Sequence, residues 1–171
     1  EVIFTYASPE FRRTFGGLSV KTQIVISPED DIELRRLTLI HRGRQPRSLE
    51  LTTYAEVVLA PDASDLAHPA FSNLFIQTEL EPERDAILCH RRPRTPDEPS
   101  PCLFHMMVVH GDTLHTVSFE TNRAKFLGRG RSPADALAIE AGGALSNTSG
   151  SVLDPVLAIR HAIIMQPGQT V

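Results

Sequence analysis

Apolar and polar side chains alternate along several segments of this chain, as they do in β-strands that bury one face. Between positions 47 and 60 the odd-numbered residues are mainly apolar, and polar residues take the even positions up to 56. Residues 18–26 alternate in the same way, directly after a turn sequence with two glycines. Both segments are therefore predicted to be half-buried antiparallel strands.

Two other segments depart from simple alternation. The phase of the apolar positions in residues 31–41 slips near position 35, and a β-bulge there would explain the slip. Residues 103–109 are apolar on both parities, which is typical of a central strand covered on both faces. A turn at 111–112 then predicts a hairpin between this strand and residues 116–121.

Proline marks the segments that do not fit a strand. Residues 61–71, and residues 92–101 with four prolines, are predicted to be irregular. A capping serine followed by proline opens residues 132–137, which predicts one short helix. Residues 156–165 follow a similar signal and suit a helix, but their β-branched residues favour a strand.

The composition is that of an ordinary globular domain. The chain has 171 residues, of which 41% are hydrophobic, and this is enough to bury one core. Its formal net charge of -4 provides no overall field for nucleic acid. No apolar run approaches the roughly 20 residues that cross a bilayer, so these residues are expected to be soluble and to make no membrane contact. The expected fold is all-β, one antiparallel β-sandwich domain over residues 1–171 with at most one or two short helices.

Two features concern the context of the chain. It begins with strand-like residues and has no initiator methionine, so it is expected to be a truncated fragment of a larger multidomain protein. Cys89 and Cys102 flank the proline-rich segment. They are interpreted as free buried thiols, because a disulfide scaffold carries more cysteines.

No motif for covalent or metal catalysis stands out in the sequence. There is no Gly-x-Ser-x-Gly element, and neither cysteine has the local sequence of a known nucleophile. His105, His110 and His115 are spaced by five, which on strands sends neighbours to opposite faces and away from a shared metal. Glu50 and Glu56 are interpreted as part of a solvated sheet face, not as a catalytic pair. No catalytic residue, metal or cofactor is therefore predicted.

Three polar segments are candidates for ligand contact. Asp65 and His68 could hold a ligand or simply hydrogen bond to each other. Glycines and arginines in residues 126–131 suit an anion, although a tight turn with exposed arginines is the simpler interpretation. The arginines of residues 91–94 have no aromatic neighbours in sequence for base stacking and are interpreted as a solvated loop.

Five separated blocks of the sequence together resemble a known protein family. They are residues 35–42 (RRLTLIHR), 50–61 (ELTTYAEVVLAP), 65–75 (DLAHPAFSNLF), 120–130 (ETNRAKFLGRG) and 150–155 (GSVLDP). In this order they resemble the β-supersandwich domain of glycoside hydrolase family 94, formerly glycosyltransferase family 36, and most of all the copies in bacterial cyclic β-1,2-glucan synthases. One departure is Asn122, where related sequences have Asp before Arg123.

The resemblance implies a place within a larger enzyme. Inverting phosphorolysis of β-glucosidic bonds would be carried by an (α/α)6 barrel that follows the sandwich and is absent from these residues. The implied parent is a transferase that makes a cyclic glucan from UDP-glucose, with this domain on the cytoplasmic face of the bacterial inner membrane. The expected partners are β-1,2-linked glucan, the adjacent barrel and a second copy in a homodimer. Contacts to carbohydrate or to an interface are expected from Asp65, His68, Arg123, Arg129 and Asp154.

Two alternatives to a non-catalytic, carbohydrate-associated domain stay open. The similarly folded aldose mutarotases use a histidine and a carboxylate as acid and base, which would make this chain an enzyme acting on sugar. The domain could also be a purely structural interaction module.

Overall fold

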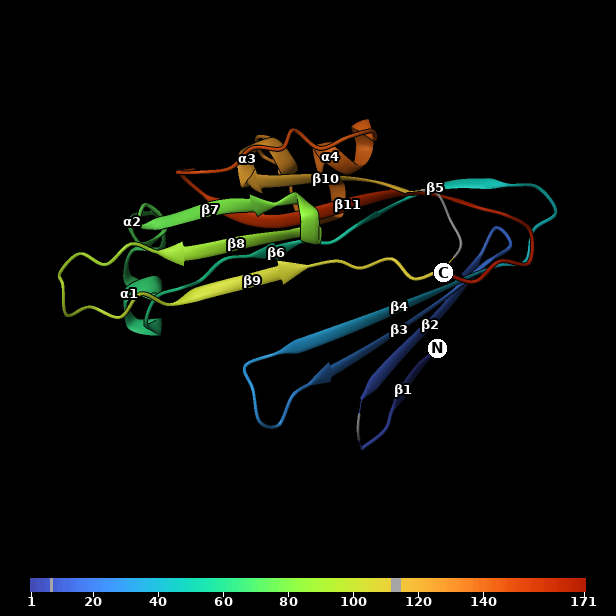
Figure 1. Ribbon diagram of the computed structural model, residues 1–171, viewed down its shortest axis with the longest axis horizontal. Coiled ribbons are helices and arrows are strands. Elements are labelled where there is room, and N and C mark those ends of the chain that lie inside the picture. Colours follow the sequence, from blue (N-terminus) through green and yellow to red (C-terminus); the bar gives the residue numbers. More distant parts are fainter. Residues whose placement is uncertain (7, 112–114) are drawn as a thin grey trace. The chain divides into compact units, whose positions relative to one another are not determined.

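The computed structural model describes residues 1–6, 8–111 and 115–171, which form two compact units. Unit 1 contains residues 1–49, 109–111 and 163–171, and unit 2 contains residues 50–108 and 115–162. Antiparallel strands dominate both units, so the predicted all-β sandwich class is confirmed (Figure 1). That residues 1–171 form a single domain stays a prediction.

Unit 1 is built on a four-stranded antiparallel sheet whose strands follow chain order. The strands are β1 (Val2–Phe4), β2 (Pro9–Phe15), β3 (Leu18–Ile26) and β4 (Glu33–His41). β3 has the predicted bounds. The turn between β2 and β3 consists of Gly16 and Gly17, whose φ angles of 52° and 78° are left-handed. Two consecutive positive φ angles suit a tight hairpin and explain why both turn residues are glycine.

The predicted bulge near position 35 is wrong. β3 and β4 pair without interruption, from Leu18 opposite His41 to Ile26 opposite Glu33. Residues 33–37 at the start of β4 are all exposed, so no buried face imposes an alternating pattern on them. The slip in the sequence therefore reflects exposure and not an extra residue.

Unit 2 contains two sheets that pack face to face. One has the order β7 (Ile76–Glu81), β8 (Ala86–Arg91) and β9 (Cys102–Met106). The other has the order β10 (His115–Asn122), β11 (Pro155–Met165) and β5 (Arg47–Thr52), and β6 (Ala55–Glu56) also pairs with β11. Both sheets contribute to one buried cluster, formed by Val57, Ile76, Ile87, Cys89, Phe119, Leu157 and Ile159. This cluster is the interior of a β-sandwich.

Strand β11 is covered on both faces. Leu157 and Ile159 lie in the cluster between the sheets, while Val156 and Ala158 lie in a second cluster with residues of α3 (Arg123–Leu127). Figure 1 shows α3 and α4 (Leu137–Ala141) on the side of β10 and β11 that faces away from β7. The strand predicted over residues 156–165 is confirmed.

The predicted central strand over residues 103–109 is wrong. β9 lies at the edge of its sheet and pairs only with β8, and Phe104 and Met106 are about half exposed. The predicted hairpin with residues 116–121 is also wrong, because β9 and β10 belong to different sheets. Asp112, in the predicted turn, lies outside the described residues, as does the side chain of His115.

Proline is the first residue of three short helical segments in the described chain. Residues 61–71, predicted to be irregular, instead form α1 (Asp62–Ala67) and lead into α2 (Pro69–Asn73). Pro69 occupies the first helical turn, where the missing N–H breaks no hydrogen bond. The predicted short helix appears as a 3₁₀ turn, η2 (Pro133–Asp135), with a capping box between Ser132 and Asp135. A second 3₁₀ turn, η1 (Pro82–Arg84), lies between β7 and β8, and residues 92–101 are irregular as predicted.

Arg160 is a buried charge on the helix-covered face of β11. Its side chain is 2% exposed, and its Nε donates to Thr52 Oγ1 at 2.8 Å. Its two terminal nitrogens donate to the carbonyl oxygens of Gly143 at 2.6 Å and Ala138 at 2.9 Å. Glu50 lies 3.4 Å from Arg160 and also accepts from the amide of Gly143, while its side chain stays exposed, as the interpretation as a solvated residue predicted. Arg160 thereby connects β5, β11 and α4.

We expect the substitution Arg160→Met to lower the free energy of unfolding by about 3 kcal/mol, because the buried carbonyls and Thr52 lose their donors together. Urea unfolding followed by circular dichroism measures the change. The matched control is Arg129→Met at an exposed arginine, expected to stay within about 0.5 kcal/mol of the parent chain. A loss below about 1 kcal/mol for Arg160→Met would show that the hydrogen bonds do not hold these elements together.

The two cysteines are free, but only one is buried. Burial raises the pKa of Cys89 to about 12, while Cys102 is exposed, so the prediction of two buried thiols is wrong for Cys102. We expect a thiol reagent to modify Cys102 at once and Cys89 only on unfolding, because the reactive species is an accessible thiolate. Timed labelling with peptide mass spectrometry tests this order. Equal labelling rates in the native chain would contradict it.

Candidate functional site

Two of the residues predicted to form a site, Arg123 and Asp154, come together in unit 2. Arg123 begins α3, and its Nε lies 3.0 Å from Glu56 Oε1 on β6. Its Nη1 lies 3.5 Å from Asp154 Oδ2, just before β11. The main-chain N–H of Arg123 also donates to the carbonyl oxygen of Asp154 at 3.0 Å. Arg123 and Asp154 are thus joined both through their side chains and through their main chains.

Two neighbours complete what we call the Arg123 cluster, defined as Tyr54, Glu56, Asn73, Arg123 and Asp154. The hydroxyl of Tyr54 donates to Glu56 Oε1 at 2.9 Å. The Tyr54 ring stacks on Phe126 of α3, with ring centres 4.9 Å apart. Asn73 at the end of α2 donates to Asp154 Oδ1 at 3.2 Å. The cluster therefore joins α2, α3, β6 and the loop before β11.

Asn122, the residue that departs from the family pattern, caps helix α3. Its side-chain oxygen accepts from the amides of Ala124 at 3.0 Å and Lys125 at 3.4 Å. Asparagine serves this role as well as aspartate does. Arg123 keeps two carboxylate partners, Glu56 and Asp154, although residue 122 is not acidic.

The hydrogen bonds of the cluster keep its carboxylate ionised. The hydrogen bond from Tyr54, followed by the hydrogen bond from Arg123, lowers the pKa of Glu56. The hydrogen bond to Glu56 is the main reason that the pKa of Arg123 is raised, and burial raises the pKa of Tyr54. The side chains of Glu56, Asp154 and Arg123 are 55%, 46% and 38% exposed, so these ion pairs orient the groups more than they stabilise the fold.

The other predicted site residues do not join the Arg123 cluster. Asp65 lies on α1, and His68 lies between α1 and α2. Within the described ranges no hydrogen bond or ion pair joins the side chains of Asp65 and His68, and none joins either of them to Arg123. Arg129 is exposed after the helix, while its neighbour Arg131 pairs with Glu140.

An aromatic ring that the sequence interpretation missed lies beside the arginines of residues 91–94. The guanidinium groups of Arg91, Arg92 and Arg94 lie 5.1, 5.9 and 5.7 Å from the ring centre of Phe75. Arg91 is buried and donates to the carbonyl oxygen of Ser72 at 3.0 Å. The interpretation as a solvated loop is therefore wrong for the buried Arg91, while Arg92 and Arg94 are exposed as expected and all three lie beside an aromatic ring. The antiparallel pairing of Ile76 with Arg91 creates the contact between segments 16 residues apart.

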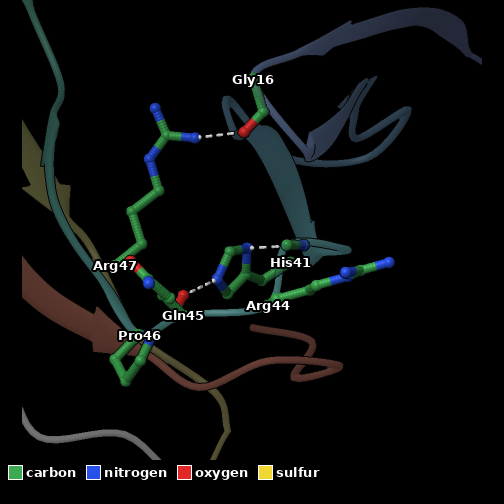
Figure 2. A pocket seen from close by; sticks show the side chains of 7 residues that line it. Gly16, His41, Arg44, Gln45, Pro46 and Arg47 are labelled. Atoms are coloured by element: carbon green, nitrogen blue, oxygen red, sulfur yellow. Dashed lines mark hydrogen bonds between the residues drawn. The ribbon is translucent and has the colours of Figure 1, made fainter.

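A pocket of about 410 Å³ lies in unit 1, between the loop after β4 and the turn between β2 and β3 (Figure 2). Its lining residues are Gly16, His41, Gly43, Arg44, Gln45, Pro46 and Arg47. Arg47 donates to the carbonyl oxygen of Gly16 at 2.8 Å, and His41 Nε2 lies 2.7 Å from the carbonyl oxygen of Gln45. The sequence pattern did not indicate this pocket, because its parts come from two distant turns.

Metal binding and membrane crossing were both considered from the sequence. Within residues 1–6, 8–111 and 115–171, no group of three or more His, Cys, Asp or Glu side chains is arranged to hold a metal ion. No helix among these residues is long and apolar enough to cross a membrane.

The fold and the paired cluster define an all-β sandwich domain with a surface site in which Glu56 and Asp154 pair with Arg123. The family described as glycosyl hydrolase 94, supersandwich domain, matches residues 1–171. The chain therefore belongs to this family, as the five sequence blocks predicted. It is 36% identical over 162 residues to the cyclic beta-(1,2)-glucan synthase NdvB of Rhizobium meliloti (strain 1021). The match covers 95% of this chain and 6% of the length of that relative.

We expect Tyr54→Phe to raise the pKa of Glu56 toward its ordinary value, because the largest effect lowering it is the Tyr54 hydrogen bond. A carboxylate with a lowered pKa stabilises the fold above its ordinary pKa, and this contribution is lost as the pH falls through its folded-state pKa. The stability difference between Tyr54→Phe and the parent chain should therefore be largest near neutral pH and shrink in acid. Carbon NMR titration of the Glu56 carboxyl and urea unfolding against pH measure the two effects. Glu10, which has no tyrosine partner, is the internal control, and an unchanged Glu56 titration would contradict the assignment.

Proposed function

We propose that this chain is a non-catalytic module of a larger glucan-processing protein, and that the Arg123 cluster contacts β-1,2-linked glucan or a neighbouring domain. The observation that carries the proposal is how the carboxylates of the cluster are paired. Glu56 and Asp154 flank one guanidinium, and the pKa of Glu56 is lowered.

A lowered pKa argues against acid–base catalysis by Glu56. A general acid that works near neutral pH needs a pKa raised by burial or by a like charge. Glu56 is half exposed and next to a cation, which has the reverse effect. The cluster is therefore better suited to binding than to proton transfer.

The same arrangement suits hydrogen bonding to a polar ligand. Ionised carboxylates accept hydrogen bonds from the hydroxyl groups of a ligand, and the guanidinium donates hydrogen bonds to the hydroxyl oxygens. The stacked Tyr54 and the helix cap at Asn122 hold these groups in place before a ligand arrives, which reduces the entropy lost on binding. A glucan chain presents many hydroxyl groups of both kinds.

Family membership provides the wider context of the proposal. In the parent protein the module would pack against an (α/α)6 barrel that performs the chemistry, on the cytoplasmic face of the inner membrane. Strand β9 offers an open sheet edge with the exposed side chains Phe104 and Met106, which suits a contact with a second domain or a second copy. The half-buried Asp65 and the exposed His68 and Arg129 remain proposed contact residues outside the Arg123 cluster.

The enzyme alternative receives no support from a specific contact. An acid and base of the mutarotase type would place a carboxylate near His68, and Asp65 makes no hydrogen bond to it in the part of the chain described. We therefore retain mutarotation only as an outcome of the experiment. Turnover of glucose anomers that is lost in His68→Ala would replace the proposal.

We expect β-1,2-glucan oligosaccharides to shift the amide NMR signals of Arg123 and its neighbours saturably at millimolar concentration. Arg123→Gln should weaken binding about fivefold to tenfold, because it removes charged hydrogen bonds. The control Arg84→Gln changes an exposed arginine of η1 and should leave the affinity unchanged. If no signal shifts, glucan contact is excluded. Ultracentrifugation with a longer chain that includes the downstream domain then tests the packing role, and failure of both would remove the proposal.

A further inference from the structure

Two stretches of unit 1 carry only basic charges, although the whole chain is acidic. Residues 11–28 and 34–49 contain eight Lys and Arg and no Asp or Glu. Arg12 and Lys21 pair with Glu10, and Arg35 pairs with Glu33. Within the described chain the other five have no acidic partner, and they are Arg13, Arg36, Arg42, Arg44 and Arg47. Arginines without an acidic partner are free to attract an anion.

Two of the unpaired arginines, Arg44 and Arg47, line the pocket of unit 1 (Figure 2). No carboxylate is among the residues that line it. Its volume of about 410 Å³ is in the range of small-molecule sites. The pocket is shallow and open to solvent, and the charged side chains that line it are all basic.

Arg47 is held in position before any ligand binds. One of its five N–H donors goes to the carbonyl oxygen of Gly16 at 2.8 Å. Its guanidinium also lies 5.7 Å from the ring centre of Phe15, as does that of Arg13. Figure 2 shows the other terminal nitrogen of Arg47 without a bond to the residues drawn. Most N–H donors of the Arg47 guanidinium are thus left to bind an oxyanion.

His41 holds the loop of residues 43–47, which lines the pocket. The amide of Gly43 donates to Nδ1 at 3.3 Å, so Nδ1 carries no proton and Nε2 donates to the carbonyl oxygen of Gln45. Both ring nitrogens therefore have hydrogen-bond partners within the loop. A side chain at position 43 would lie 2.6 Å from His41 Cε1, which explains the glycine. The histidine acts as a structural support, and the arginines provide the charge.

We propose that this pocket binds the phosphate group of a small molecule, either a soluble sugar phosphate or a lipid headgroup. Arg47 would contact the phosphate oxygens, and the exposed Arg44, whose side chain extends away from Arg47 in Figure 2, would turn toward them from the same loop. A phosphate monoester carries close to two negative charges and several acceptor oxygens, which match several guanidinium groups better than one carboxylate does. This site is independent of the Arg123 cluster and of the glucan proposal.

The test is a titration of the 171-residue chain with glucose 6-phosphate and with inorganic phosphate, monitored by calorimetry and by the amide NMR signals of residues 41–47. Glucose is the uncharged comparison. We expect saturable binding of the phosphate compounds alone, weakened at least about fivefold by Arg47→Gln and by Arg44→Gln. Arg44 is exposed and makes no side-chain contact in the described structure, so its substitution tests the site without risk to the fold.

Two comparisons decide between a site and unspecific charge. Arg84→Gln removes the same charge from η1 in unit 2 and should leave phosphate binding unchanged. Arg47→Lys keeps the charge but loses the fork, and should bind more weakly than the parent chain. Sedimentation with vesicles that contain phosphatidic acid, whose headgroup is a phosphate monoester, compared with phosphatidylcholine alone, identifies a lipid source if binding there also depends on Arg44 and Arg47. The proposal is overturned if no phosphate compound and no vesicle binds, or if Arg84→Gln weakens binding as much as the pocket variants do.

Discussion

Burial of β11 on both faces is the constraint on which the rest of unit 2 depends. Val156, Leu157 and Ile159 are almost fully buried, and each contributes roughly 1.5–3 kcal/mol by leaving water. One set of side chains requires the sheet of β7 to β9 as cover, and the other requires α3 and its neighbours. The same strand carries Arg160, whose burial is tolerated because Thr52, Ala138 and Gly143 accept its hydrogen bonds.

The Arg123 cluster follows from the same packing. Helix α3 begins where β10 ends because Asn122 caps it, and Phe126 and Leu127 bury its inner face. This anchors Arg123 at the exposed end, where Glu56 and Asp154 arrive from two other segments. Its ion pairs are exposed and contribute little stability, so the cluster is positioned by the core beneath it. A polar surface supported in this way can accept a ligand without rearrangement of the fold.

Several features were predicted from the sequence because their causes are local. Alternation of apolar residues gave the right bounds for β3, and β-branched residues identified β11. Ser132 and Pro133 marked a helical turn because a cap and a preset φ act within a few residues. The predictions failed where the same apolar pattern can arise from more than one arrangement of strands. Residues 103–109 have apolar side chains on both parities, yet β9 is an edge strand, since its neighbours are chosen by the whole sheet.

The sequence by itself determined the all-β class and the family, and it named Arg123 and Asp154 as candidate contact residues, because these depend on local patterns and on blocks preserved in order. Only the tertiary structure decided which charges meet. Phe75 reaches Arg91 through the pairing of β7 with β8, Glu50 reaches Arg160 across β5 and β11, and Arg47 reaches Gly16 across two turns. Contacts of this kind join residues far apart in the chain. They arise from strand register and sheet packing, which one stretch of sequence does not specify.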